Sequence, residues 1–373
     1  MARNTGKKVR RRGRRRKRGF ATWSIGKKIG AVLGGTLLGV VVIGSVILAS
    51  KMNKLSSVKL DTDKLNISDE VKHEKGYTNV ALFGLDSREK NLGKGNRTDT
   101  IMIASINNET KKVKLVSVYR DTMLKQNGEH YDKANAAYSV GGPETAVNML
   151  NENLDLNIQD YVSVNFLALA DVIDMVDGIT VKLTDEEVVH MNNYCVETSK
   201  VTGKKYKKIE PAVAGTYKLN GVQAVSYARI RYTAGGDYKR TERQRLVLKK
   251  TADKLKQQDL ATLNKIIDKV MPEVSTSFTT KEILSLATGA FDYELGETTG
   301  FPFDLETPEQ IPGYSGSYVI PKGLEENVIK LHQFLYPNKD YTPTATVTDI
   351  SNTLNDMTNV YPNTTESGTS QNE

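Results

Sequence analysis

The chain of 373 residues has few of the residues on which common metal and nucleophile sites depend. Cys195 is its one cysteine, so no disulfide can form within the chain. The four histidines, at positions 73, 130, 190 and 332, lack the short spacing of a zinc site. Neither a Gly-x4-Gly-Lys-Ser/Thr loop nor a Gly-x-Ser-x-Gly elbow occurs, which argues against a P-loop nucleotide site and an α/β-hydrolase nucleophile.

Charge is unevenly distributed along the chain. Residues 1–28 contain thirteen Lys and Arg and no acidic residue, so the rest carries a net charge of −5 although the whole chain is +8. Such a tail can bind nucleic acid, or it can fix membrane orientation and contact anionic lipid headgroups. We favour the second interpretation, because the basic cluster lacks interleaved aromatic residues and precedes an apolar run.

That apolar run, residues 29–50, contains no charged residue. It exceeds both the about 20 residues needed to cross a bilayer and the about 7–15 of a secretory signal core. We predict an uncleaved transmembrane helix with the basic tail in the cytoplasm, hence a single-pass type II protein of the cell membrane. The expected division is a tail at 1–28, an anchor at 29–50, a stalk at 51–77, an extracytoplasmic catalytic domain at 78–338 and a disordered polar tail at 339–373.

Hydrophobic patterning in the domain predicts a single large α/β fold with a mixed central sheet flanked by helices. Strands are expected at 79–84, 100–106, 112–118, 161–165, 179–183 and 316–321. Helices are expected at 133–138, 143–154, 166–176, 220–228, 237–257, 260–270, 281–291 and 324–335, and an exposed polar excursion at 193–209. The helix at 166–176 is apolar nearly all round, which is typical of plain core and would also suit the lining of a lipid site.

The first three strands place charged residues together if they are antiparallel neighbours. One edge of the sheet then carries the end of the first strand, the start of the second and the end of the third. The charged side chains at these three points are Asp86 and Arg88, Arg97 and Asp99, and Arg120 and Asp121. Two close aspartates repel unless a cation lies between them or one is protonated. Asp86 and Asp99 are therefore candidate ligands for Mg²⁺, or Mn²⁺ in its place, although each alone could cap a turn.

A second arginine-rich segment lies at residues 226–245. If extended, it places Arg229 and Arg231 on one face, and on the following helix Arg240 and Gln244 fall on the apolar stripe. Arg245 falls on another face and is predicted to be solvated. Inward-facing guanidinium groups require an anion. An internal network with Asp237 and Glu242 is the alternative, but two acids cannot neutralise five arginines, so we favour an external polyanion.

Six ordered motifs resemble the LytR–CpsA–Psr family of bacterial envelope proteins. They occupy residues 84–88 (GLDSR), 97–100 (RTDT), 118–122 (VYRDT), 133–138 (KANAAY), 161–166 (YVSVNF) and 229–244. The resemblance implies transfer of an anionic glycopolymer, of the teichoic-acid or capsule type, from a polyprenyl-pyrophosphate carrier to peptidoglycan, with Mg²⁺ at the pyrophosphate. It also implies a metal role for Asp86 and Asp99.

For the pyrophosphate, the resemblance implies Arg97, Arg120, Lys133, Arg229, Arg231, Arg240 and Gln244, and we add Arg88 and Arg243 from the same segments. Asp121 and Asp237, with Arg120, are the catalytic candidates, because one of the acids must orient or deprotonate the acceptor hydroxyl. Expected partners are the lipid-linked glycan donor, the peptidoglycan acceptor and membrane lipid. A polyprenyl-pyrophosphate phosphatase and a DNA-binding transcriptional attenuator remain alternatives. The predicted span argues against nucleic acid as a partner, since it separates the folded domain from DNA.

Overall fold

A seven-stranded mixed sheet forms the centre of the structure, which is a computed structural model describing residues 56–57, 59–71, 76–85, 92–279, 282 and 293–363. Its strand order is β1-β10-β7-β2-β3-β4-β11. The strands are β1 (Ser56–Ser57), β2 (Tyr77–Leu85), β3 (Thr98–Asn107), β4 (Lys112–Val118), β7 (Ile158–Asn165), β10 (Val274–Thr276) and β11 (Glu294–Phe301). β2, β3 and β4 are antiparallel neighbours, whereas β2 pairs with β7 and β4 with β11 in parallel. The predicted mixed sheet and the order of its first three strands are confirmed.

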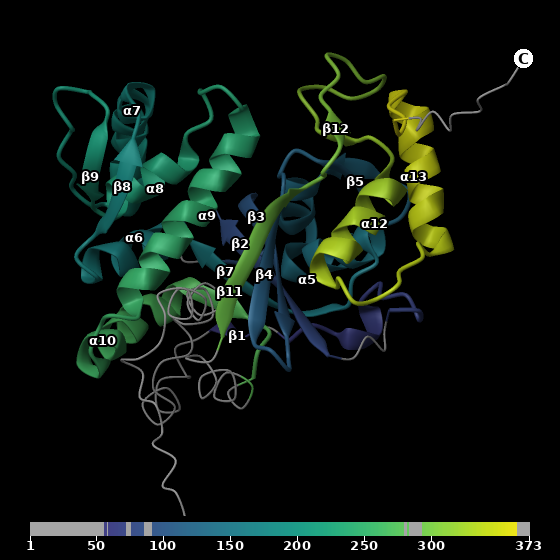
Figure 1. Cartoon of the computed structure of the whole chain (residues 1–373), viewed down its shortest axis with the longest axis horizontal. Coiled ribbons are helices and arrows are strands. Elements are labelled where there is room, and N and C mark those ends of the chain that lie inside the picture. Colours follow the sequence, from purple (N-terminus) through teal and green to yellow (C-terminus); the bar gives the residue numbers. More distant parts are fainter. Residues whose placement is uncertain are drawn as a thin grey trace, which may run out of the picture.

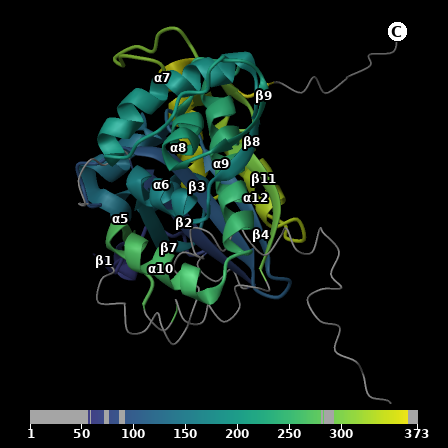
Figure 2. The ribbon, with the colours of Figure 1, turned by 90° about the vertical axis from the view of Figure 1, so that its left-hand side faces the viewer.

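Alternation along the strands buries both faces of the sheet. In β2, Val80 and Leu82 belong to one apolar cluster, whereas Ala81 and Phe83 belong to the other. The first face packs on helices α6 (Phe166–Met175), α9 (Gly236–Leu255) and α10 (Leu260–Val270). The second packs on α5 (Ala134–Leu154), α12 (Leu324–Leu335) and α13 (Ala345–Thr358). The sheet is therefore the middle of three layers, as Figures 1 and 2 show.

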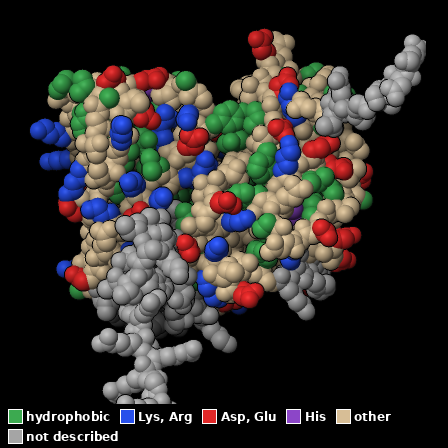
Figure 3. All heavy atoms as spheres, in the orientation of Figure 1, with side chains coloured by type: hydrophobic (Ala, Val, Ile, Leu, Met, Phe, Trp, Pro, Cys, Tyr) green, Lys and Arg blue, Asp and Glu red, His purple; other side chains and the backbone are tan. Residues whose placement is uncertain are grey.

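A smaller lobe extends beyond α6 and α9. It contains β8 (Ile179–Leu183), α7 (Asp185–Thr202), β9 (Gly215–Leu219) and α8 (Gly221–Arg229), which share a third apolar cluster. Capping boxes begin both helices, Thr184 with Glu187 in α7 and Asn220 with Gln223 in α8. Lys and Arg side chains are more frequent on this half of the surface in Figure 3, at left.

The β3–β4 turn and the register of β2, β3 and β4 determine which strand ends meet at one edge of the sheet. The Asn107 side chain accepts from the backbone N–H groups of Glu109 and Thr110, which closes the β3–β4 hairpin. At the opposite end of these strands, Leu85 lies opposite Thr98 and Ile101 opposite Val118. The start of β3 and the residues after β4 therefore meet at one edge, as predicted. The expected partners Asp86 and Arg88 lie outside the described residues.

Two predictions of local structure are wrong. Residues 193–202 are not an exposed excursion, because α7 continues through them and buries Cys195 and Thr198. Arg229 is not in an extended segment but is the last residue of α8. The two helices expected at 133–138 and 143–154 are confirmed as the two halves of α5, which is kinked at Gly142, where φ is 76°, and Pro143 begins the second half.

The predicted polar tail is also wrong for residues 339–363. Here α13 packs Val347, Ile350 and Leu354 into the core beneath the sheet. Asp155, at the end of α5, anchors the approach to this helix by accepting hydrogen bonds from Tyr341 Oη, Thr344 N and Thr344 Oγ1. The low apolar content of the segment misled the prediction, because the few apolar residues fall on one face of a helix.

Leu354→Ala is expected to lower the free energy of unfolding by about 2–5 kcal/mol, because it removes a buried side chain from the core. Chemical denaturation of the full chain measures the change. Asn352→Ala, at an exposed position of the same helix, is the matched control and should change stability by less than about 0.5 kcal/mol. Equal stability of the two variants would contradict this packing of α13.

The segments that the sequence assigns to the membrane fall outside the described residues, as does nearly all of the helix expected at 281–291. In the described part of the chain, no helix combines the length and hydropathy needed to cross a bilayer. The expected stalk, by contrast, is partly built into the domain. Leu60 and Leu65 lie in the core cluster, and the Asn148 side chain of α5 bonds the backbone of Lys64 and Asn66.

Candidate functional site

A polar cavity of about 550 Å³ lies at the edge where β3 begins and β4 ends. Six of its lining side chains are cationic, Arg97, Arg120, Lys133, Arg229, Arg231 and Arg240. Gly95, Asn96, Asp99, Asp121, Asn135, Tyr194 and Gln244 are the other described residues of the lining. The cavity therefore collects residues from the two arginine-bearing segments, which lie more than a hundred positions apart in the sequence.

Asp121 is the carboxylate that joins the cations of this cavity. Its Oδ1 lies 3.3 Å from Lys133 Nζ, and its Oδ2 lies 3.2 Å from Arg231 Nη2 and 3.5 Å from Arg120 Nε. Arg120 also forms an ion pair with Asp99, whose backbone carbonyl accepts from Gln244 Nε2 at 3.2 Å. Both aspartates thus hold cationic side chains in place around the cavity.

Arg240 enters the cavity from α9 and is almost fully buried, with 3% of its side chain exposed. Its Nη2 lies 2.6 Å from Asp237 Oδ1, and Arg231 Nε lies 3.7 Å from the same oxygen. Burial raises the pKa of the Asp237 carboxyl above its ordinary value, although the charge of Arg240 opposes the shift. Asp237 does not line the cavity, so its role is to support the two arginines that do.

Arg229 lies beside both a carboxylate and two aromatic rings. Its guanidinium contacts Glu197 at 3.1 Å and Thr198 at 3.1 Å from α7. The same group lies over the rings of Phe166 and Tyr194, 5.2 and 5.8 Å from their centroids. Counting Asp99, Asp121, Asp237 and Glu197 against the six cations, the described residues of the site have two more positive than negative charges. This excess of positive charge favours an anionic ligand.

The alternative of a closed internal network does not describe this arrangement. Glu242, one of its two expected acids, pairs instead with the exposed Lys239 at 2.7 Å. Among the described residues, no ion pair involves Arg97, which lines the cavity and is exposed. The site therefore presents cations to solvent as well as to its own carboxylates.

Arg243 does not line the cavity, contrary to its predicted placement. It is buried on the neighbouring face of α9, where its Nε donates to Glu187 at 2.9 Å. The other guanidinium nitrogens donate to the Ile230 carbonyl and to Thr233 Oγ1. Arg243 thus holds the loop that carries Arg231, and its contribution to the site is to position Arg231.

Arg245 is not solvated, contrary to the facing argument from sequence. α9 packs against both the sheet and the smaller lobe. The face of this helix that carries Arg245 is therefore covered as well, by β4. Arg245 Nη1 donates to the buried Ser117 Oγ of β4 at 2.8 Å, and burial lowers the pKa of its guanidinium.

Arg245→Ala is expected to lower the free energy of unfolding by about 1–3 kcal/mol, because it removes a partner of a buried hydroxyl. It should leave the affinity of the cavity for inorganic pyrophosphate unchanged, since Arg245 does not line it. Calorimetric titration of the full chain, with chemical denaturation of the same sample, separates the two effects. A loss of affinity without a loss of stability would contradict this placement.

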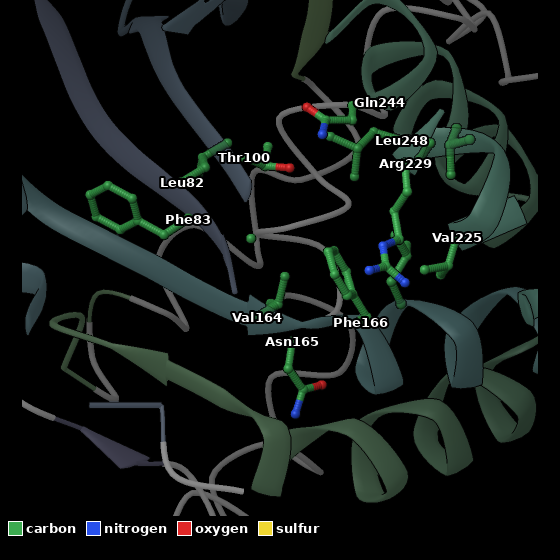
Figure 4. Close-up of a pocket in the computed structure, with 14 residues that line it drawn as sticks. Leu82, Phe83, Thr100, Val164, Asn165, Phe166, Val225, Arg229, Gln244 and Leu248 are labelled. Carbon is green, nitrogen blue, oxygen red and sulfur yellow. The ribbon is translucent and has the colours of Figure 1, made fainter. Parts of the chain in front are cut away.

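A second cavity, narrow and apolar, adjoins the first. Its volume is about 50 Å³, and it lies between the ends of β2, β3 and β7 and helices α6, α8 and α9. Phe166, Leu169, Val225, Val247 and Leu248 are among its lining residues. Arg229 and Gln244 line both cavities, and Figure 4 shows them at the helical side, with Phe166 close to the Arg229 guanidinium. The apolar helix at 166–175 thus serves the core and a cavity together.

One of the two predicted metal ligands, Asp99, lies in the polar cavity. Among the described residues, no group of three or more His, Cys, Asp or Glu side chains is placed to hold a metal ion. Mg²⁺ needs only one or two carboxylates when phosphate oxygens and water complete its shell. Asp99 supplies such a hard oxygen donor inside the cavity. Its predicted partner, Asp86, lies outside the described residues.

Sequence reasoning missed Tyr194 and Glu197 on α7. Both lie in the segment that was expected to be an exposed excursion, so nothing placed them near the arginines. Asn135 was quoted within a motif but given no role, and it too lines the cavity. A helical analysis of residues 185–202 would have aligned Met191, Cys195 and Thr198 on one buried face and shown that the segment packs.

Comparison with known proteins decides the family. The chain matches the model of the LytR_cpsA_psr family over residues 42–295. It belongs to the LytR–CpsA–Psr family. The chain is 32% identical over 220 residues to biofilm regulatory protein A of Streptococcus mutans, and the match covers 56% of this chain and 52% of that protein. The chain thus spans about half the length of that relative.

A second LytR–CpsA–Psr relative is the polyisoprenyl-teichoic acid–peptidoglycan teichoic acid transferase TagU of Enterococcus faecalis, 29% identical over 272 residues, or 71% of this chain and 84% of that protein. Among solved structures, the fold resembles YwtF (TagT) with bound octaprenyl pyrophosphate lipid. The TM-score is 0.53 at 22% identity, covering 74% of this chain and 99% of that one. This likeness establishes the LytR–CpsA–Psr fold.

Proposed function

We propose that the protein is a phosphotransferase that moves an anionic glycopolymer from a polyprenyl-pyrophosphate carrier to peptidoglycan. The observation that carries the proposal is the pair of adjoining cavities, one cationic and one apolar, with Arg229 and Gln244 common to both. A ligand that fits this pair has an anionic head joined directly to an apolar tail. The names of the TagU relative and of the lipid-bound TagT structure support the same ligand class.

The cationic side chains would hold the pyrophosphate. Arg97, Arg120, Lys133, Arg229, Arg231 and Arg240 can each donate charge-assisted hydrogen bonds to phosphate oxygens, with Gln244 as a neutral donor. Three of these cations contact Asp121 in the protein without ligand. A bound pyrophosphate competes with Asp121 for them, and the carboxylate becomes free to accept a proton as the anion binds.

The transfer step then follows from charge and position. An acceptor hydroxyl attacks the phosphorus that bears the glycan, the bridging P–O bond breaks, and prenyl phosphate leaves. The hydroxyl proton passes to Asp121, which lines the cavity, whereas Asp237 does not. Asp99, with Asp86, would hold a magnesium ion, which supplies further neutralisation of phosphate charge when bound.

The apolar cavity would receive the beginning of the prenyl chain. A volume of about 50 Å³ is too small for a prenyl chain of several units, so the lining must open on binding. Phe166 and Leu169 on α6 face Val225 and Leu248 on the other helices across the cavity, and their side chains are the ones that must move. When no carrier is bound, the same side chains close the cavity and keep water out.

Transfer is tested with the full chain in detergent, an octaprenyl-pyrophosphate-linked saccharide, soluble peptidoglycan fragments and Mg²⁺. A covalent saccharide–peptidoglycan product, detected by mass spectrometry, is the expected result. Hydrolysis at the same rate with abundant acceptor, and no linked product, would establish the phosphatase instead. A protein that neither binds nor cleaves the donor would refute both.

The membrane arrangement is part of the proposal. The thirteen basic residues before an uncharged run support an inside tail and an outside domain. Alkaline phosphatase fused after Glu373 should therefore be active, since that enzyme requires export. An inactive fusion, produced in equal amount, would reverse the orientation.

A further inference from the structure

Three aromatic rings lie together next to the polar cavity, and we call His190, Tyr194 and Tyr232 the aromatic platform. The rings of Tyr194 and Tyr232 are stacked, with centroids 6.4 Å apart and planes inclined by 25°. The ring centroids of His190 and Tyr232 are 6.2 Å apart, and their planes are inclined by 33°. Tyr232 is 73% exposed although it lies beside two other rings, so most of its surface faces solvent.

The platform is held in position by side chains on two helices. Tyr232 lies in the loop between α8 and α9, on which Arg243 donates to the residues at 230 and 233. Arg243 is itself fixed by Glu187 on α7, the helix that carries His190 and Tyr194. The exposed ring therefore stays near its partners on α7 without packing against the core.

The platform is continuous with the site. Tyr194 lines the polar cavity, and Tyr232 directly follows Arg231, which also lines it. Arg229 lies over both Tyr194 and Phe166, and Phe166 belongs to the apolar cavity. The order of surfaces is therefore apolar cavity, cationic cavity and aromatic platform, with Arg229 at the first boundary and Tyr194 at the second.

A pyrophosphate carrier has groups in the same order. Its prenyl chain and its sugar leave the pyrophosphate from opposite ends, so a carrier with its chain in the apolar cavity directs its sugar away from that cavity. The sugar face of a pyranose presents C–H groups with partial positive charge, which suit the negative face of an aromatic ring. A flat, exposed tyrosine can thus bind a sugar whose hydroxyl groups remain in water.

We propose that the aromatic platform is a pyranose subsite of the protein, with Tyr232 as its principal contact. The position of this subsite beside the pyrophosphate rests on the proposed function, whereas the contact of a sugar with the aromatic rings does not. The pyranose comes from the donor, as the sugar nearest the pyrophosphate, or from the glycan strand of the acceptor. Both sources share the ring chemistry, and separate probes distinguish them.

The experiment measures binding to the full chain in detergent by calorimetric titration. The probes are octaprenyl pyrophosphate, the same lipid bearing one N-acetylglucosamine, and a soluble peptidoglycan disaccharide–peptide. Tyr232→Ala should weaken binding of the sugar-bearing probe by about two- to tenfold and leave the sugar-free lipid unchanged. Tyr232→Phe should retain wild-type affinity, because it keeps the ring. Tyr361→Ala is the matched control, since Tyr361 is 52% exposed and follows α13, at the opposite end of the molecule from α7.

The outcomes test the pyranose subsite and the proposed transferase function separately. A loss seen only with the disaccharide–peptide assigns the platform to the acceptor and supports the subsite. An equal loss for both lipids would overturn it, because Tyr232 would then act only on Arg231 and the pyrophosphate. If Tyr232→Ala binds every sugar-containing probe as the wild type does, the platform is not a sugar site, although the proposed function stands. If the wild type binds no lipid, the proposed function fails, and the disaccharide–peptide still tests the platform.

Discussion

Replacing Asp121 by asparagine is expected to lower the kcat of transfer by about 10²–10⁴-fold, while the carrier binds at least as tightly as it does to the wild type. Asparagine keeps the size of the side chain but cannot accept the hydroxyl proton. It also no longer attracts Arg120, Lys133 and Arg231 electrostatically, which leaves these cations more available to pyrophosphate. Single-turnover rates and equilibrium titration of the carrier, measured on the same preparation, separate the two effects.

Asp237→Asn is the matched control for this prediction. Asp237 is also a partly buried carboxylate with arginine partners, but it does not line the cavity. Its replacement should loosen Arg231 and Arg240 and so reduce carrier affinity more than kcat. If Asp121→Asn retains wild-type kcat and Asp237→Asn does not, the two assignments must be exchanged.

Arg240→Ala is expected to have the second large effect, on stability and on binding together. The substitution leaves the buried Asp237 without its nearest cation, which should cost about 3–5 kcal/mol of the free energy of unfolding. Loss of one charge-assisted contact should also lower carrier affinity by about 1.5–3 kcal/mol. Denaturation and carrier titration give the two quantities.

A double variant and a change of pH distinguish these two effects. Arg240→Ala combined with Asp237→Ala should regain most of the lost stability and none of the lost affinity. Without Arg240, burial of Asp237 raises its folded-state pKa further, so the folded protein binds more protons than the unfolded chain. The stability deficit of Arg240→Ala should therefore shrink as the pH falls below neutrality. A deficit independent of pH would show that its cause is lost packing.

Sequence periodicity predicted the parts of the site that regular elements position. The Asn107-Asn108 turn and the assumed antiparallel order of β2, β3 and β4 predicted which strand ends meet, and this brought Asp99, Arg120 and Asp121 to one edge. The stripe of α9 likewise placed Arg240 and Gln244 in the interior. The helix position follows from one local pattern, whereas the strand edge also depended on the strand order.

Periodicity failed where an element is covered on more than one side. Arg245 was predicted to be solvated and Arg243 to bind the pyrophosphate, but β4 covers the first and the smaller lobe covers the second. The contacts of Tyr194 with Arg229 and Tyr232 depend on how α7 lies against α8, and no local pattern encodes that arrangement. The same limit applies to α13, whose few apolar residues are informative only once α5 and α12 are in place.

If residues 29–50 cross a bilayer as the sequence predicts, the entry of the chain into the sheet limits the distance between the proposed site and that bilayer. β1 pairs with β10 at Ser275 and Thr276, and these residues lie opposite Ser163 and Val162 in the strand that ends at Asn165, beside the apolar cavity. Six residue steps separate Ser50, the end of the predicted span, from Ser56, and fully extended they reach about 20 Å. With that topology, the domain is on a short tether and works within a shallow layer above the membrane. In the proposed transfer, the carrier would then need only to tilt its headgroup out of the lipid, and the acceptor would have to reach the membrane surface.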